Sequence, residues 1–414
     1  MKALVFGAFP DGPQFDVPSD ANHLVRNLAT TPMTLQAVDD PTLLGPDWVV
    51  LRPRLTGICG SDGKQVFMDM VDSAGGSDQT MTAFISFPQV LGHEVVADVV
   101  EVGPDARGVA VGDRVLLNCW LSCGPRGITP PCPACAAGDL ANCWNFTRGR
   151  LTPGIHTGNS SDATGGFAEL MPAHDSMVFP VPHTVSDEVA VLADPFAVSL
   201  HAITRNPPPE NSKVVVWGGG ALGSTSIAIL RALYPTVSVA AVVRHPAQQA
   251  LASQYGAHVV NSEQTPEAIV AALAEWSGEE LLKPWQGLPI AYPGTIAVIY
   301  DTIGAPTTVE QGLRVIATHG RIVVTGVSAP DRFEWGPLYF KEVHVIGSNA
   351  FGVEEVHGVR KHAIEHYLDL VESGRIDIAP MLTHTFRLDE WIDAFTCIAN
   401  QHETGAIKVA FDFR

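Results

Sequence analysis

Two kinds of hydrophobic pattern divide the chain. Up to about residue 185, short apolar runs rich in Val and Leu alternate with turn residues, which is typical of a β-rich domain. From there the pattern changes to runs of Val and Ile that alternate with helical periodicity, as in KVVVWG followed by ALGSTSIAILRAL. That alternation predicts βαβ units and a parallel sheet. Near the end we expect two helices, VEEVHGVRKHAIEHYLDLVESG and LDEWIDAFTCIANQ, and a last strand, AIKVAFDF.

The change of pattern predicts two domains. We expect an α/β domain over 186–348, inserted into a β-rich domain made of 1–185 and 349–414. A length of 414 residues is enough for two domains that each bury a core. No stretch approaches ~18 uninterrupted apolar residues, so we expect no membrane span. The N-terminal MKALVFGAFPDG resembles a first strand more than a signal peptide, which favours a cytoplasmic location.

Charge narrows the class of partner. The chain has 25 Lys and Arg against 44 Asp and Glu, a formal net charge of −19. A surface that binds nucleic acid or anionic lipid needs clustered Lys and Arg, so we expect neither partner. A small molecule is the expected ligand.

A glycine-rich turn in the α/β region predicts a dinucleotide site. The expected strand Lys213–Trp217 runs directly into GGGALG, which opens a helix and satisfies G-x-G-x-x-G. The first glycine permits a tight turn, the second lets the backbone approach a pyrophosphate, and the third lets helix and strand pack closely. The helix start supplies free N–H groups for the anion. The residues expected to bind the cofactor here are Gly218, Gly220, Ala221, Leu222 and Gly223.

The end of the next expected strand predicts which cofactor is used. An acid that would bond the adenosine ribose is expected about 20 residues after the loop. Instead, the strand VSVAAVV is followed by Arg244 and His245. Both side chains suit a 2′-phosphate, so we expect NADP(H) rather than NAD(H). The alternative is that Arg244 begins a solvated helix and stacks on adenine.

Five of the seven cysteines lie in the segment 119–143, which suggests a metal site. Four thiolates suit a closed, tetrahedral structural zinc, whose ligands leave no open position for catalysis. Cys119 and Cys397 are expected to be spectators. The expected ligands are Cys123, Cys132, Cys135 and Cys143.

Two short motifs upstream combine groups that could serve catalysis. GICGSD joins the soft ligand Cys59 to the hydroxyl of Ser61 and the carboxylate of Asp62. LGHE places the imidazole of His93 beside the carboxylate of Glu94. Either motif alone is ordinary, but together with a nucleotide loop and a zinc cluster they indicate a metalloenzyme.

The motifs as a set resemble the zinc-dependent medium-chain dehydrogenase/reductase superfamily, the alcohol dehydrogenase family. Its pieces occur in the family's order over nearly the whole chain: GICGSD, LGHEVVADVVEVG, GDRV, CPACAAGDLANC, GGFAEL, GGGALG and GAIKVAF. The resemblance implies an α/β protein in which a GroES-like, β-rich catalytic domain joins a Rossmann domain. It also implies a zinc-containing, NAD(P)-dependent alcohol dehydrogenase, with one catalytic and one structural zinc in each chain.

The resemblance also implies roles for single residues. Cys59 and His93 become ligands of the catalytic zinc, and the sorbitol and threonine dehydrogenase branch points to Asp194 as the third ligand. Glu94 could bind the catalytic zinc intermittently, and a water molecule could complete the coordination sphere of the metal. The resemblance further implies that Ser61 carries the proton, that Asp62 orients His93 and that Lys408 contacts the cofactor pyrophosphate. Lys64, where many relatives have a relay histidine, is left outside the catalytic set.

The leading hypothesis is therefore hydride transfer between NADP(H) and an alcohol or carbonyl substrate. One alternative is a reductase of the same fold that acts on a C=N or conjugated C=C bond in secondary metabolism. Another is a non-catalytic zinc-binding module. The resemblance further implies a homodimer or a homotetramer.

Overall fold

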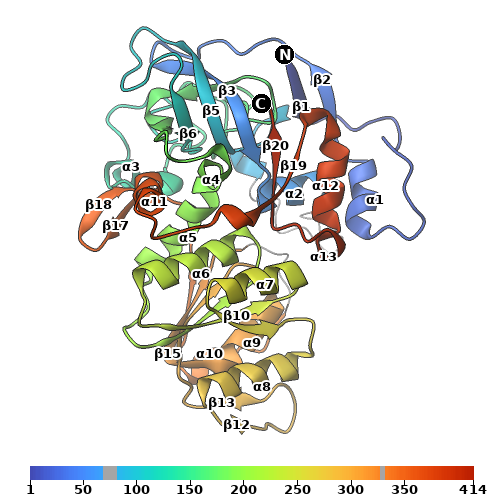
Figure 1. The fold of residues 1–414 in the computed structure, drawn as a ribbon, viewed down its shortest axis with the longest axis vertical. Helices are drawn as coiled ribbons and strands as arrows, with labels where there is room; N and C mark the ends of the chain where they lie inside the picture. The colour runs from blue at the N-terminus through green and yellow to red at the C-terminus, as the bar shows by residue number, and fades with distance from the viewer. Residues whose placement is uncertain (69–81, 327–331) are drawn as a thin grey trace. The chain divides into compact units, whose positions relative to one another are not determined.

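The structure is a computed structural model, and it describes residues 1–68, 82–326 and 332–414. The chain forms two compact units (Figure 1). The first unit comprises Met1–Asp194, Lys361–Glu372 and Leu382–Arg414. The second unit comprises Pro195–Arg360 and Ser373–Met381. The hydrophobic pattern predicted the corresponding boundaries after residues 185 and 348.

The first unit is built on two sheets. The larger sheet has the order β19 (Leu382–Phe386), β20 (Lys408–Asp412), β3 (Trp48–Gly57), β5 (Glu94–Val102), β6 (Arg114–Leu117) and β8 (Val178–Pro180), with β7 (Met171–His174) paired to β3. The smaller sheet has the order β2 (Met33–Ala37), β1 (Lys2–Phe6) and β4 (Gln89–Val90). All their strand pairs are antiparallel except β19 with β20. This unit is the expected β-rich domain.

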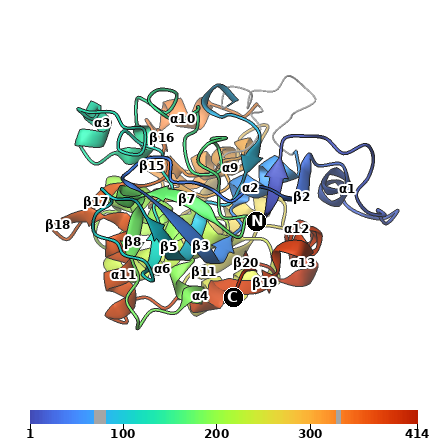
Figure 2. The same cartoon turned by 90° about the horizontal axis from the view of Figure 1, so that it is seen from above.

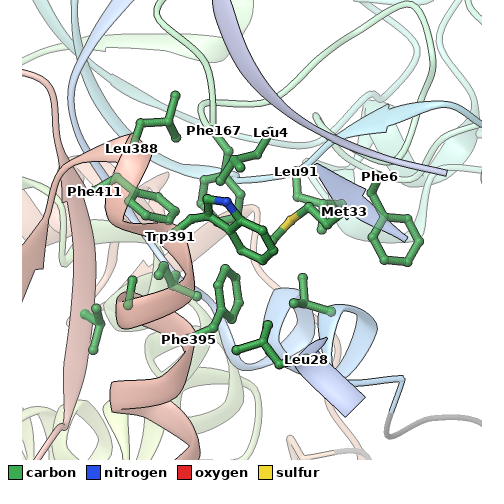
Figure 3. Packing of buried hydrophobic residues seen from close by; sticks show 14 of the residues in the cluster. Leu4, Phe6, Leu28, Met33, Leu91, Phe167, Leu388, Trp391, Phe395 and Phe411 are labelled. Carbon is green, nitrogen blue, oxygen red and sulfur yellow. The ribbon is translucent and has the colours of Figure 1, made fainter. Parts of the chain in front are cut away.

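Both ends of the chain contribute to the core of the first unit. Its helices are α1 (His23–Ala29), α2 (Gly60–Val66), α3 (Pro133–Ala136), α4 (Asp187–Ala190), α11 (Ala363–Glu372), α12 (Trp391–Ala399) and α13 (Gln401–Thr404). Helices α1 and α12 lie side by side (Figures 1 and 2). Figure 3 shows one buried cluster, which includes Leu4, Phe6, Leu28, Met33, Leu91, Phe167, Leu388, Trp391, Phe395 and Phe411. Burial of these apolar side chains holds the C-terminal segment onto the N-terminal one.

The second unit is a six-stranded sheet in which every pair is parallel. Its order is β11 (His258–Asn261), β10 (Ser238–Val243), β9 (Lys213–Trp217), β14 (Ile296–Asp301), β15 (Ile316–Val324) and β16 (His344–Gly347). Its helices are α6 (Ala221–Leu233), α7 (Pro246–Gln254), α8 (Pro266–Ser277), α9 (Pro306–Val315) and α10 (Gly336–Phe340), and α5 (Ala193–Arg205) leads into it. The order is that of a Rossmann sheet, with its reversal between β9 and β14. The predicted fold class is confirmed.

One predicted helix is wrong over half its length. The stretch 353–374 forms β17 (Val353–Val356) and β18 (Val359–His362) before helix α11 begins. The two residues between the strands, His357 and Gly358, have φ of 49° and 80°. Two successive positive φ values are typical of a tight hairpin turn, and a helix cannot pass through them. The valines of this stretch favour β-strands, and the prediction of a helix gave their preference too little weight.

Two long stretches between the motifs are described to different extents. The stretch 63–89 includes residues 69–81, which lie outside the described residues. The stretch 277–294 forms a small antiparallel hairpin of β12 (Leu281–Leu282) and β13 (Ile290–Ala291). Among the described residues, no helix is long and apolar enough to cross a membrane.

Candidate active site

Three neighbouring strands bring the predicted catalytic residues together in the first unit. Strands β20, β3 and β5 are adjacent, and Gly57 at the end of β3 pairs with Glu94 of β5 and Ala410 of β20 (Figure 1). Cys59 follows two residues after Gly57, and His93 directly precedes β5. The strand register therefore gathers motifs that are more than 30 residues apart in sequence.

Two glycines make this meeting point possible. A side chain at Gly57 would overlap the carboxylate of Glu94 and approach Lys408 Cε to 3.0 Å. Gly92 has a φ of +90°, and a side chain there would collide with the ring of Phe167. Only glycine is tolerated at position 92, because a Cβ atom would disfavour the positive φ and would also collide with Phe167.

Cys59, His93 and Glu94 form a group with the chemistry of a metal site. One ligand atom from each lies within 4.8 Å of the others. A thiol, an imidazole and a carboxylate are the donors that zinc takes in enzymes. The donor set therefore fits the zinc that the sequence implied, although Glu94 occupies the place in the group that the resemblance gave to Asp194.

Asp62 holds His93 in position. Its Oδ1 lies 3.5 Å from His93 Nδ1, and its Oδ2 accepts the backbone N–H of Cys59 at 3.0 Å. Burial alone would raise the pKa of the Asp62 carboxyl, but the neighbouring charge of His93 and the N–H of Cys59 bring it below its ordinary value. Asp62 is thus a buried carboxylate that contacts Cys59 and His93, two of the three predicted ligands of the catalytic zinc.

Glu94 forms a buried ion pair with Lys408. The side chains are 1% and 3% exposed, and Lys408 Nζ also donates to the carbonyl of Ile58 at 3.0 Å. Burial acts to lower the pKa of Lys408, but the charges of Glu94 and Cys59 raise it above its ordinary value. Lys408 therefore has partners inside the first unit, and its contact with a cofactor pyrophosphate stays a prediction.

Asp194 lies beside Cys119, a cysteine that was expected to be a spectator. Asp194 is the second residue of α5 and is buried, and its Oδ2 is 3.7 Å from the thiol of Cys119. Burial raises the pKa of Asp194 to about 7, and burial together with Asp194 raises that of Cys119 well above its ordinary value. Cys119 lies outside the four-cysteine group and contacts Asp194 instead. Its separation of 75 residues from Asp194 hid the contact.

His156 is a second residue of this pocket that no sequence signal indicated. Its ring lies 4.4 Å from that of His93, and Trp120 packs edge-on against it at 5.9 Å. His156 Nδ1 is 2.7 Å from the carbonyl of Thr157. Burial is the largest cause that lowers its pKa, to about 3. His156 is therefore a neutral ring beside the predicted metal ligands.

Ser61, the predicted proton carrier, lies near the start of α2, two residues after Cys59. It is the second residue of α2, it is exposed, and its neighbour Asp62 is buried. Because consecutive helical residues point in different directions, Asp62 can contact His93 while the neighbouring Ser61 stays exposed. Lys64, one turn further along α2, is half-buried.

The four predicted structural cysteines converge at a second point of the first unit. The thiols of Cys123, Cys132, Cys135 and Cys143 lie within 4.8 Å of one another. Several N–H groups point at these sulfurs: the backbone of Trp144 at Cys132, and the side-chain amide of Asn145 at Cys123. Donors of this kind stabilise thiolates. The cluster fits a closed, four-thiolate zinc site.

A buried arginine holds the lobe that carries these cysteines. Arg126 is 1% exposed, and its guanidinium donates to five backbone carbonyls. The acceptors belong to Leu121, Arg148, Leu151, Thr152 and Gly154, at 2.7–3.1 Å. Burial lowers the pKa of Arg126 to about 10, so it stays protonated at neutral pH.

The glycine loop of the second unit has the geometry that a pyrophosphate needs. Gly218 follows β9 with a φ of +104°, and a side chain at Gly223 would collide with the carbonyl of Gly218. A side chain at Gly220, the residue that caps α6, would meet no atom within 4 Å. The loop thus packs tightly on its own strand and leaves open space at the start of the helix. Arg244 is exposed and His245 half-buried at the end of β10.

Two protein-family models match this chain. Residues 45–183 match the family described as Alcohol dehydrogenase GroES-like domain, and residues 221–370 match the family described as Zinc-binding dehydrogenase. The starvation-sensing protein RspB of Escherichia coli K12 is 25% identical over 88% of this chain and 92% of its own length. The L-threonine 3-dehydrogenase of Pyrococcus abyssi is 27% identical over 85% of this chain and 88% of its own length.

This chain belongs to the zinc-dependent medium-chain dehydrogenase superfamily. The resemblance predicted from the sequence motifs is thereby confirmed, and the protein is an oxidoreductase. The non-catalytic zinc module considered as an alternative is thereby wrong.

Solved structures of the same fold contain nicotinamide cofactors. The alcohol dehydrogenase RspB from Escherichia coli CFT073, crystallised with NADH, is 22% identical, with a TM-score of 0.73 and coverage of 100% of this chain and 99% of its own. A zinc-binding dehydrogenase from Sinorhizobium meliloti 1021, bound to NADP, is 24% identical, with a TM-score of 0.68 and coverage of 99% of both chains. One solved structure of this fold thus holds NADH and another holds NADP, and the family model matched by 221–370 is that of a zinc-binding dehydrogenase.

Proposed function

We propose that this dehydrogenase interconverts an alcohol and its carbonyl compound, with NADP(H) as the preferred hydride carrier. The observation that carries the proposal is the position of Ser61, an exposed hydroxyl two residues from Cys59 in the Cys59–His93–Glu94 group. A hydroxyl at the edge of a zinc donor set is what proton removal from an alcohol requires. Cys59, His93 and Asp194 are the proposed ligands of the catalytic zinc, with Glu94 as an intermittent ligand.

Each residue of the pocket has a task in this reaction. When bound, zinc supplies a Lewis acid that lowers the pKa of the substrate hydroxyl. Ser61 takes the departing proton and passes it toward solvent, since its side chain is exposed. Asp62 keeps the imidazole of His93 in one orientation through the 3.5 Å contact. Lys408 compensates the buried charge of Glu94.

Metal content and a substrate screen test the proposal together. We expect two zinc ions per chain by metal analysis, and NADPH formation at alkaline pH with at least one member of a panel of secondary and polyhydroxy alcohols. Zinc in the four-cysteine site alone would contradict the catalytic assignment. Two zinc ions with activity only on imines or conjugated enones would instead favour the C=N or C=C reductase.

Preference for NADP(H) is proposed from Arg244 and His245. Both follow the last residue of β10, where a carboxylate would otherwise bond the ribose. A guanidinium contact with a phosphate contributes about 1.5–3 kcal/mol.

Replacement of Arg244 by Asp should therefore lower the ratio of kcat/KM for NADP⁺ to that for NAD⁺ by roughly 10- to 100-fold. Steady-state kinetics with both cofactors measures this ratio, and Arg244→Lys, which retains the charge, should change it far less. A wild-type preference for NAD⁺ would overturn the assignment.

We also propose that the enzyme is a cytoplasmic homodimer or homotetramer. Strand β16 is the edge of the six-stranded sheet, and the helix just before it exposes large rings. Tyr339 is 84% exposed and Phe340 64% exposed. Such an apolar edge is typical of an interface with a second copy.

Tyr339→Asp should weaken self-association, because it buries a charge in the proposed interface. Sedimentation velocity over a range of protein concentrations measures the effect. Val111→Asp, at a comparably exposed valine of the first unit, is the matched control and should sediment as wild type. Equal behaviour of both variants would contradict this location of the interface.

A further inference from the structure

Cys119 and Asp194 lie about as far apart as two ligands of one zinc ion. The sulfur and the carboxylate oxygen are 3.7 Å apart. Two donors on one tetrahedral zinc, with Zn–S near 2.3 Å and Zn–O near 2.1 Å, are separated by roughly 3.6 Å. In the four-cysteine cluster of the same chain, Cys123 and Cys143 are likewise 3.7 Å apart. The Cys119–Asp194 pair thus has the spacing of one edge of a coordination tetrahedron.

Asp194 is the proposed third ligand of the catalytic zinc, beside Cys59 and His93, and Cys119 contacts it directly. Burial is the largest cause that raises the pKa of each, and the charge of Asp194 raises that of Cys119 further. Cys119 is completely buried, and its carbonyl accepts the N–H of Thr157 at 2.8 Å. The backbone therefore holds this thiol in the pocket, where solvent does not reach it.

The proposed ligands, the intermittent ligand Glu94 and Cys119 together make five donor side chains, and one of them is already engaged. Glu94 is paired with Lys408, whose ammonium competes for the same carboxylate. The four that remain are a thiol, an imidazole, a carboxylate and a second thiol. That number and these types are a complete tetrahedral set for zinc.

We propose that Cys119 is a fourth protein ligand of the catalytic metal in the resting enzyme. With Cys59, His93 and Asp194 it closes the coordination sphere, and a substrate oxygen must displace it to reach the metal. The inference rests on the proposed function, because it assumes that this pocket holds zinc. The competing explanation is a thiol that only donates a hydrogen bond to Asp194.

Cobalt substitution distinguishes these two roles. Thiolates bound to Co²⁺ give intense near-ultraviolet charge-transfer absorption, which scales with their number. Wild-type enzyme is treated with a chelator and Co²⁺ so that one metal is exchanged and the other zinc is retained, and metal analysis confirms the content. The variants Cys119→Ser, Cys59→Ser and, as a matched control, Cys397→Ser receive the same treatment.

With two thiolates on the exchanged metal, Cys119→Ser and Cys59→Ser should each lose about half of the charge-transfer intensity per bound cobalt. Cys397→Ser should lose none, because this buried cysteine lies in the core cluster of the first unit. Serine retains a hydroxyl that can donate to Asp194, so a mere hydrogen-bond role predicts an unchanged spectrum for Cys119→Ser.

The outcomes separate the inference from the proposed function. Equal intensity in wild type and Cys119→Ser, at equal cobalt content, would overturn the ligand role of Cys119. A wild-type chain that binds metal only in the four-cysteine cluster would overturn the zinc assignment itself. Azide binding to the cobalt enzyme is a second readout. Azide should bind several fold more tightly to Cys119→Ser, because loss of the thiolate frees a coordination position on the metal. Weaker or equal azide binding would contradict the displacement of Cys119 by substrate.

Discussion

Replacement of Arg126 by Met should lower the free energy of unfolding by about 3–5 kcal/mol. The guanidinium donates to five carbonyls of the segment 121–154, and methionine can donate to none. The buried carbonyls would then lack partners that solvent cannot replace. Because the same segment carries all four cysteines of the structural cluster, its loosening should also speed the release of zinc.

Denaturant unfolding and transfer of zinc to a chromogenic chelator measure the two effects. Arg148→Met is the matched control, since the side chain of Arg148 is exposed while its backbone carbonyl accepts from Arg126. We expect that control to change stability by no more than about 0.5 kcal/mol. A stable Arg126→Met variant with wild-type zinc release would show that the cysteine cluster does not depend on the arginine.

Replacement of Ser61 by Ala should lower kcat by roughly 10²- to 10⁴-fold, the usual contribution of a positioned proton carrier. Removal of the hydroxyl leaves the substrate proton without its acceptor, whereas the metal donors stay in place. Since Ser61 is exposed on α2, stability should change little. Steady-state kinetics, together with zinc content and thermal unfolding, measures these quantities.

Ser61→Thr provides the matched control, because it restores a hydroxyl at the same position. We expect it to recover most of the activity that Ser61→Ala loses. If Ser61→Ala retains near wild-type kcat while chemistry limits the rate, Ser61 does not carry the proton. If zinc content falls with activity, the residue supports the metal site rather than proton transfer.

Local sequence was informative wherever the chemistry depends on neighbours along the chain. The glycine loop lies between its own strand and helix, so GGGALG and the preceding KVVVWG predicted both its structure and its ligand. The cysteines of the structural cluster lie within 21 residues, Cys123 to Cys143, and their spacing was sufficient. Where the local pattern was ambiguous, as at 353–362, the valine-rich hairpin was mistaken for helix.

The sequence by itself determined the family, the two-unit organisation, the Rossmann loop and the candidate ligands, because each rests on short-range spacing or on periodicity. Only the tertiary structure decided which donors meet. Glu94 and Lys408 pair because β5 and β20 flank β3, and Cys119 reaches Asp194 because the chain returns to the pocket 75 residues later. Such contacts depend on strand register and burial, which join distant segments and leave no local pattern. For that reason the cysteine first set aside as a spectator became the candidate for the fourth ligand.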